Sequence, residues 1–213
     1  MSGHTNLLIY GSEILAGCRI NATGSLDASA TLTIDFGVDS CDNGRNITVN
    51  EKIIKFDERE VVEFGSAFQD IKIILSNCDD HISVEQTYST ASSIEIVGAA
   101  GNDRIVLGND DIGFEASIFA NVIIDGKNDR NMLVIKDGAS SALKSNIDIR
   151  SSVITGIHED PQKRIDHFNV DEYSISLGST SANVTVSLTS DGKSLYVATQ
   201  NSEDVIWIKE GEQ

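Results

Sequence analysis

The sequence has few aromatic residues, one proline (Pro161) and a shortage of positive charge. No run approaches the roughly 20 apolar residues that a membrane-spanning helix needs, so we expect no membrane insertion. Lys and Arg number 16 against 33 Asp and Glu, which gives a formal charge of −17. Because nucleic-acid binding requires clustered cationic contacts, we expect no nucleic acid among the partners.

The residues that are abundant favour short strands and tight turns. Of the 213 residues, 40% are hydrophobic, which is enough to bury a core, and 17 are glycine. Apolar β-forming clusters such as Ile71–Leu75 and Val184–Leu188 recur at intervals of about ten to fourteen residues. Polar turn sequences such as Asp125-Gly126 separate them. No segment keeps a helical period, so the chain is predicted to be all-β.

Parts of the sequence occur twice. Three blocks align without gaps at offsets of 102, 101 and 100 residues: 71–84 with 173–186, 94–107 with 195–208, and 46–49 with 146–149. Nearly constant offsets indicate a duplicated unit and favour a repeat architecture.

Two all-β architectures fit short strands at this spacing. Asn-Gly hairpin signals are few, whereas Ile-x-Ile triplets alternate with Gly, Asn and Asp corners, as stacked coils require. We therefore predict a parallel β-solenoid (a β-helix or β-roll) with an internal duplication of about 100 residues, and keep a β-sandwich as the alternative. The predicted boundaries are an N-terminal cap or linker (1–30), a first repeat (31–110) and a second repeat (111–213).

The sequence also resembles a known family. The similarity is carried in the second copy by Val122–Gly138, Val153–Ile157 and Asp171–Gly178, and in the first copy by Asp70–Leu75, Asp79–Val84 and Gly98–Val106. These segments look like degenerate repeats of large extracellular proteins related to the RTX, or haemolysin-type, proteins. The resemblance implies a parallel β-helix or β-roll in a secreted or cell-surface protein, and it carries no enzymatic activity.

One corner is a candidate calcium site. Gly98–Val106 is the closest match to the calcium-binding nonapeptide of RTX repeats, in which turn carbonyls and an Asp carboxylate are ligands. The predicted ligands are Asp103 with Asn109, Asp110 and Asp111 of the next turn. The alternative is an ordinary corner, in which the same side chains bind backbone amides. Cofactors are therefore expected to be none, or Ca²⁺.

Covalent features are also suggested by the sequence. In an oxidising compartment Cys18 and Cys41 could form a disulfide, while unpaired thiols are the alternative for all three cysteines, Cys78 included. N-glycosylation sequons begin at Asn21, Asn46 and Asn183.

Catalytic residues are not predicted. The sequence has no Gly-x-Ser-x-Gly motif, and three of its four histidines lie in polar runs. The charged segment Ile157–Arg164 has no counterpart of this length in the first copy and is interpreted as a surface loop. Trp207 of the last predicted strand is expected on the less buried face.

The favoured function is a non-enzymatic structural or adhesive repeat module of a larger extracellular surface or filament-forming protein. Such a module would assemble through its ends and strand edges with copies of itself or with neighbouring repeats of a longer chain. Carbohydrate is a further candidate ligand. The alternatives are a calcium-binding RTX-type module of a secreted protein and a carbohydrate-active β-helix of the lyase or epimerase kind.

Overall fold

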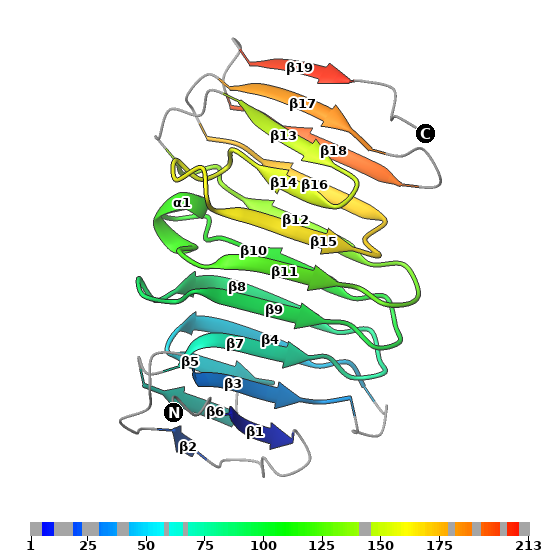
Figure 1. Ribbon diagram of the computed structural model, residues 1–213. Helices are drawn as coiled ribbons and strands as arrows, with labels where there is room; N and C mark the ends of the chain where they lie inside the picture. Colours follow the sequence, from blue (N-terminus) through cyan, green and yellow to red (C-terminus); the bar gives the residue numbers. More distant parts are fainter. Residues whose placement is uncertain are drawn as a thin grey trace, which may run out of the picture.

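The protein consists of two β-sheets that face each other across one core (Figure 1). The computed structural model describes residues 6–10, 19–22, 30–37, 43–57, 60–65, 68–140, 146–178, 182–188, 193–200 and 204–208. Within these residues the only α-helix is α1 (Gly113–Ser117). The all-β prediction is confirmed.

The strands fall into a ten-stranded and a nine-stranded sheet. In spatial order the ten-stranded sheet contains β1 (Asn6–Tyr10), β3 (Ala30–Asp35), β7 (Phe68–Ile74), β9 (Ser93–Val97), β11 (Asn121–Asp125), β15 (Arg164–Phe168), β14 (Val153–Thr155), β13 (Ile147–Arg150), β17 (Asn183–Ser187) and β19 (Val205–Ile208). The nine-stranded sheet contains β18 (Ser194–Ala198), β16 (Glu172–Ser176), β12 (Met132–Lys136), β10 (Arg104–Leu107), β8 (His81–Thr87), β4 (Asn46–Glu51), β5 (Ile53–Phe56), β6 (Glu60–Phe64) and β2 (Arg19–Ala22).

Most neighbouring strands are parallel, because the chain usually crosses to the opposite sheet before it returns. From β7 to β12 each strand lies in the other sheet from the one before it. The antiparallel pairs are confined to two meanders, β4-β5-β6 in the nine-stranded sheet and β13-β14-β15 in the ten-stranded sheet. Both sheets are therefore mixed.

The strand pairing recurs after nine strands. The pairs β1·β3, β2·β6, β4·β8 and β7·β9 correspond to β10·β12, β11·β15, β13·β17 and β16·β18. The registers correspond as well: Ile71 pairs with Ile94, and Tyr173 pairs with Leu195. Corresponding strands lie in opposite sheets.

The core is built from residues at alternate positions of the strands. In β3 buried and half-buried residues alternate, and Leu32 and Ile34 are fully buried. The same pattern in β9 buries Ile94 and Ile96. Each such aliphatic side chain stabilises the fold by about 1.5–3 kcal/mol through burial.

The two ends of the molecule are formed by different parts of the chain. Strands β1 and β2, from the segment predicted as a cap or linker, are edge strands at one end. Strands β18 and β19 are the edge strands at the other (Figure 1).

Candidate functional site

The residues predicted to bind calcium lie at opposite ends of one strand. Asp103 directly precedes β10, whereas Asn109, Asp110 and Asp111 follow it. At about 3.3 Å per residue, a four-residue strand separates the two groups by roughly 13 Å. Calcium ligands lie about 2.3–2.6 Å from the ion, so the structure does not bring the four predicted ligands together.

Asp103 belongs to a row of side chains that precede strands of the nine-stranded sheet. Its Oδ1 accepts a hydrogen bond of 3.0 Å from the amide of Asp80, and its own amide donates to Oδ1 of Asn131 at 2.9 Å. The amide of Asn131 donates in turn to Oδ2 of Asp171 at 3.1 Å. We call Asp80, Asp103, Asn131 and Asp171 the Asx ladder; it connects β8, β10, β12 and β16.

The second carboxylate oxygen of Asp103 is buried and has no hydrogen-bond partner. The pKa of Asp103 is raised to about 7, chiefly by burial and also by the nearby carboxylates of Asp80, Asp79 and Asp129, against the hydrogen bond from the Asp80 amide. Burial also raises the pKa of Asp80. The carboxyl of Asp103 therefore titrates close to neutral pH.

A second row of hydrogen bonds runs along the outside of this corner. Oδ1 of Asp79 accepts from the amide of Asn102 at 2.7 Å, and Oδ2 of Asp129 accepts from the amide of Gly101 at 2.9 Å. Gly101 has a φ of 102°, and a Cβ there would lie 2.3 Å from the carbonyl oxygen of Cys78. The polar side chains of the corner thus satisfy backbone amides of the adjacent turn.

The turn after β10 has its own polar contacts. Oδ1 of Asn109 accepts a hydrogen bond of 2.7 Å from the amide of Asp111, and Asp110 forms an exposed ion pair of 2.7 Å with Lys136. Across all described residues, no group of three or more His, Cys, Asp or Glu side chains could hold a metal ion.

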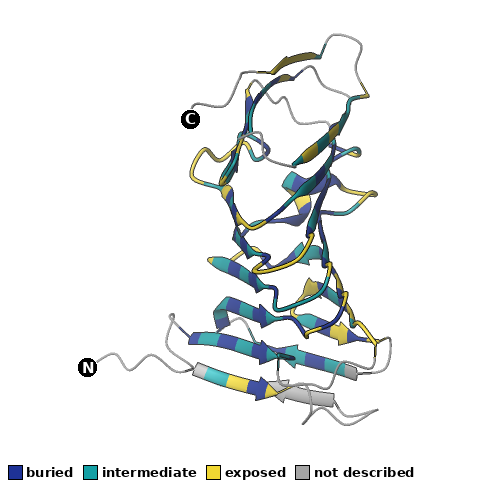
Figure 2. Ribbon diagram, turned by 90° about the vertical axis from the view of Figure 1, so that its right-hand side faces the viewer, coloured by how far each residue is buried: buried dark blue, intermediate teal, exposed yellow. Residues whose placement is uncertain are grey.

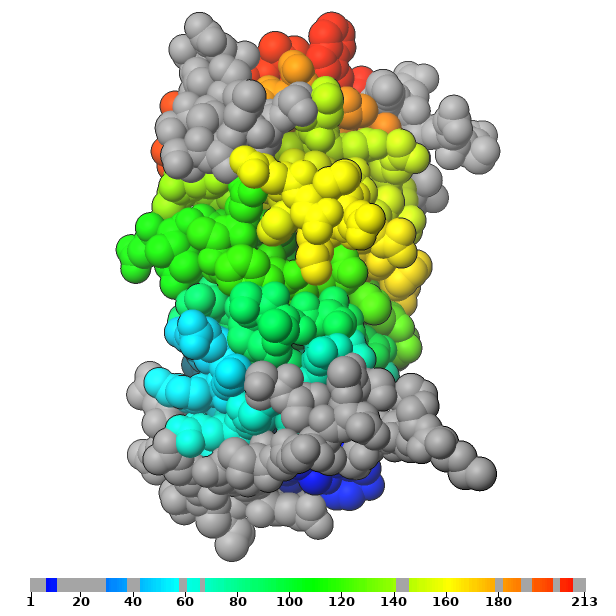
Figure 3. Space-filling model, turned by 60° about the vertical axis from the view of Figure 1, so that its left-hand side comes forward, coloured from blue at the N-terminus to red at the C-terminus, as the bar shows by residue number. Residues whose placement is uncertain are grey.

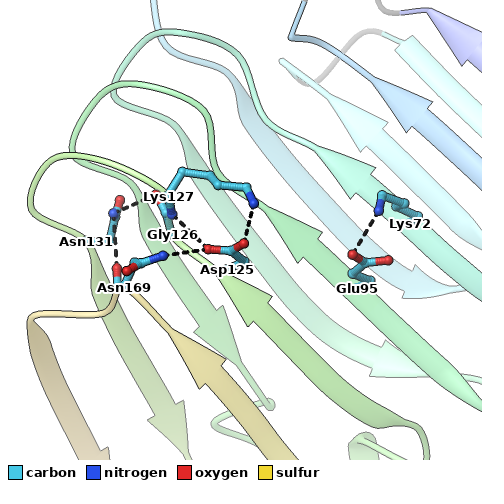
Figure 4. Close-up of polar contacts among 7 residues, drawn as sticks. All are labelled: Lys72, Glu95, Asp125, Gly126, Lys127, Asn131 and Asn169. Atoms are coloured by element: carbon cyan, nitrogen blue, oxygen red, sulfur yellow. Dashed lines mark hydrogen bonds and ion pairs between the residues drawn. The ribbon is translucent and has the colours of Figure 1, made fainter. Parts of the chain in front are cut away.

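Asn131 makes the largest set of side-chain contacts in the ladder, and the sequence analysis missed it. Its Nδ2 donates to the carbonyl oxygens of Gly126 and Asn128, both at 2.9 Å, and of Asn169 at 3.3 Å. Figure 4 shows it beside Asp125, whose carboxylate binds Lys127 and Asn169. The sequence feature that could have identified Asn131 is its position directly before a strand, which it shares with Asp103.

The predicted Cys18–Cys41 bond lies outside the described residues, whereas Cys78 and the three sequon asparagines lie within them. Cys78 is disulfide-bonded. Cys18 and Cys41 both lie outside the described residues; because the sequence has three cysteines, a bond at Cys78 is an alternative to the predicted Cys18–Cys41 bond. Among the sequons, Asn46 and Asn183 are exposed at the starts of β4 and β17, and Asn21 lies in β2.

The segment Ile157–Arg164 lines a small recess beside α1, with a volume of about 10 Å³. Its walls include Phe114, Ile157, His158 and Lys163; the space-filling view shows this region, in yellow, against α1, in green (Figure 3). Nδ1 of His158 accepts from the amide of Asp160 at 3.0 Å, and its Nε2 has no partner. The recess is smaller than the roughly 300–1,000 Å³ of small-molecule sites.

A buried histidine lies elsewhere, without access to solvent. His167 is 0% exposed, and its Nδ1 is 3.3 Å from the hydroxyl of Tyr173. That hydroxyl donates to the carbonyl of Val170 at 3.0 Å. Burial lowers the pKa of His167 to about 4, so the ring is neutral at pH 7. Because both rings are enclosed by the core, we assign them no catalytic role.

Among the described residues, five of the nine exposed large hydrophobic side chains lie in the terminal coil, which we define as β18 and β19. Tyr196, Trp207 and Ile208 are 66%, 60% and 83% exposed. In β10, the strand that corresponds to β19, Ile105 and Leu107 are fully buried. Figure 2 shows exposed residues along both strands of this end. Exposed apolar residues at a sheet edge are typical of an interaction surface.

Comparison with family models, curated proteins and solved structures found no match. In the described part of the chain, no helix has the length and apolar character needed to cross a membrane.

Proposed function

We propose that the chain is a non-enzymatic structural or adhesive module of an extracellular or cell-surface protein, built as a parallel β-solenoid of two repeats. The recurrence of the strand pairing after nine strands supports this fold, since the same pairs and registers are formed in both halves. The Asx ladder supports it too, because it connects corners in successive layers of one sheet.

The observation that carries the proposed function is the exposure of the terminal coil. Its side chains have the apolar character of an internal strand pair, and its two strands, β18 and β19, are edge strands of the two sheets. A surface of this kind favours association with a neighbouring module over chemistry in a pocket. The disulfide at Cys78 supports an oxidising, extracellular setting.

Sedimentation velocity across a micromolar concentration series tests the proposal. The wild-type chain should sediment faster as its concentration rises, because the apolar terminal coils of separate molecules meet. The double variant Trp207→Lys, Ile208→Lys should stay monomeric at every concentration. Phe168→Lys is a matched control, because Phe168 is 50% exposed in β15, outside the terminal coil. A wild-type monomer throughout, or equal association of the double variant, would contradict the proposal.

A further inference from the structure

We propose that the free edge of β18 binds an extended protein segment as an additional parallel strand, with aliphatic side chains at every second position facing the core. This inference rests on the proposed function, since it names the partner that the terminal coil would receive. Binding by strand addition uses main-chain hydrogen bonds for affinity and alternate side chains for specificity.

The strand that corresponds to β18 shows what is missing at this edge. β9 lies between β7 and β11, whereas β18 pairs with β16 alone among the described strands. Ile94 and Ile96 of β9 are fully buried, whereas Leu195 and Val197 hold the same register positions and are only partly buried. A strand that paired with β18 in the way that β11 pairs with β9 would bury Leu195 and Val197.

Strand β19, the edge strand of the other sheet at this end, gives independent support. Ile206 pairs with Val184, as Ile105 pairs with Ile82 in the first half. Ile105 is fully buried, but Ile206 is 43% exposed. Strand β11 contributes Val122 to the core that buries Ile105. A strand of the same kind on β18 would therefore cover the inner face of β19.

The backbone of β18 has donors available for such a strand. The carbonyl of Ala198 accepts from the amide of Leu177, and the amide of Ser194 donates to the carbonyl of Asp171, both at 2.8 Å. Because successive residues of a strand point their amides to opposite edges, the amides of Leu195 and Val197 point away from β16. These two amides are the donors that an added strand would meet.

An extended segment fits this edge better than a whole second copy of the chain. In a second copy, β2 corresponds to β11 and could pair with β18. However, β1 corresponds to β10 and therefore also to β19. Docking β2 onto β18 would bring β1 of the second copy to the place that β19 already occupies. An extended segment requires no strand to be displaced.

A peptide with the sequence of Phe119–Gly126, which contains β11, is the probe. Trp207 is the only tryptophan of the chain and lies in the terminal coil, so its emission reports binding there. We expect a saturable change in that emission and at least tenfold slower hydrogen exchange at the amides of Leu195 and Val197. The control peptide carries Lys at the positions of Val122 and Ile124 and should bind at least tenfold more weakly.

Two variants test the geometry. Val197→Pro removes an amide at the free edge and leaves the hydrogen bonds of its neighbours to β16, so affinity should fall at least tenfold. Ile208→Lys changes a side chain that is 83% exposed, which avoids a folding defect, and should also weaken binding at least tenfold. Phe168→Lys should bind the peptide as the wild-type chain does.

The proposal is overturned if the peptide does not bind at millimolar concentration, if the control peptide binds equally, or if no amide of β18 is protected. Cross-linking that joined β2 of one molecule to β18 of another would replace the extended segment by a second copy. Self-association without peptide binding would leave the proposed function standing and remove this inference. Peptide binding by a chain that stays monomeric would leave this inference standing and remove the proposed function.

Discussion

His167 of β15 holds the position in the strand pairing that Phe64 holds in β6. Each ring lies edge-on against a tyrosine: the centroids of His167 and Tyr173 are 5.2 Å apart, and those of Phe64 and Tyr88 are 6.0 Å apart. An ionisable ring thus occupies a core position that is filled by a hydrocarbon ring in the other half.

This exchange should make the second half sensitive to acid. The pKa of His167 is lowered from 6.5 to about 4, chiefly by burial and also by Lys193, while a backbone hydrogen bond and Asp166 oppose the shift. A depressed pKa favours the neutral ring, so its stabilising contribution is complete above pH 6.5 and is lost as pH falls through 4. We therefore expect titration of His167 to lower the free energy of unfolding by about 3 kcal/mol when the pH falls from 7 to 4.

Urea unfolding of His167→Phe at pH 7 and pH 4 measures the effect. The variant should lose about 3 kcal/mol less than the wild-type chain over this interval. The reciprocal change, Phe64→His, places a histidine at the equivalent position of the other half. It should increase the loss of unfolding free energy between pH 7 and pH 4 by a similar amount, and it serves as the matched control. Identical pH dependence of the wild-type chain and His167→Phe would show that His167 does not titrate in this way.

Asp103→Asn should stabilise the protein at neutral and alkaline pH. The pKa of Asp103 is raised from 3.8 to about 7, so its stabilising contribution is present below pH 4 and is lost as pH rises through 7. Asparagine keeps the acceptor for the Asp80 amide and removes the charge, as Asn131 already does in the ladder. We expect a gain of about 2–4 kcal/mol at pH 8 and little change at pH 4.

Thermal unfolding at pH 4 and pH 8 checks this expectation. Asp110→Asn is the control, because Asp110 is exposed and lies outside the ladder. Its variant should change stability by less than about 0.5 kcal/mol. An Asp103→Asn protein that was less stable than the wild-type chain at pH 8 would mean that the charged carboxylate is needed.

The strands could be predicted from the sequence because their apolar residues alternate. Ile94 and Ile96 follow this pattern, and both are buried. The antiparallel meanders were not predicted, because the turn from β4 to β5 lacks an Asn-Gly signal. Glu51 adopts a φ of 51° there, a conformation more typical of Gly or Asn.

The calcium motif shows a second limit of the sequence. Asp103 and Asp110 are close in sequence, but β10 extends between them and carries them to opposite ends of a strand. Sequence spacing becomes spatial proximity only when the fold of the intervening residues is known. The Asx ladder was missed for the converse reason, since Asp103 and Asn131 are 28 residues apart and meet through the stacking of β10 and β12.

Asn131→Ala should be strongly destabilising. Asn131 is fully buried, accepts from the Asp103 amide and donates to the carbonyl of Gly126. The variant leaves these backbone groups without their partner, at about 2–4 kcal/mol in total. Asn128→Ala is the matched control, because Asn128 is exposed in the same turn. Equal urea midpoints for the two variants would contradict the role assigned to Asn131.

Calcium should leave the melting temperature unchanged. An ion that bound only the folded chain at 100 times its dissociation constant would add about 2.7 kcal/mol, an effect readily seen in a melting curve. The predicted ligands cannot supply it together, because the carboxylate of Asp103 accepts from the Asp80 amide at one end of β10 and Asp110 pairs with Lys136 at the other. For each protein, the wild-type chain and Asp103→Asn, calorimetry should therefore give the same curve with millimolar Ca²⁺ as with EDTA. A calcium-dependent rise that Asp103→Asn abolished would require the corner to rearrange around the ion, since its carboxylates would have to release the amides that they now bind.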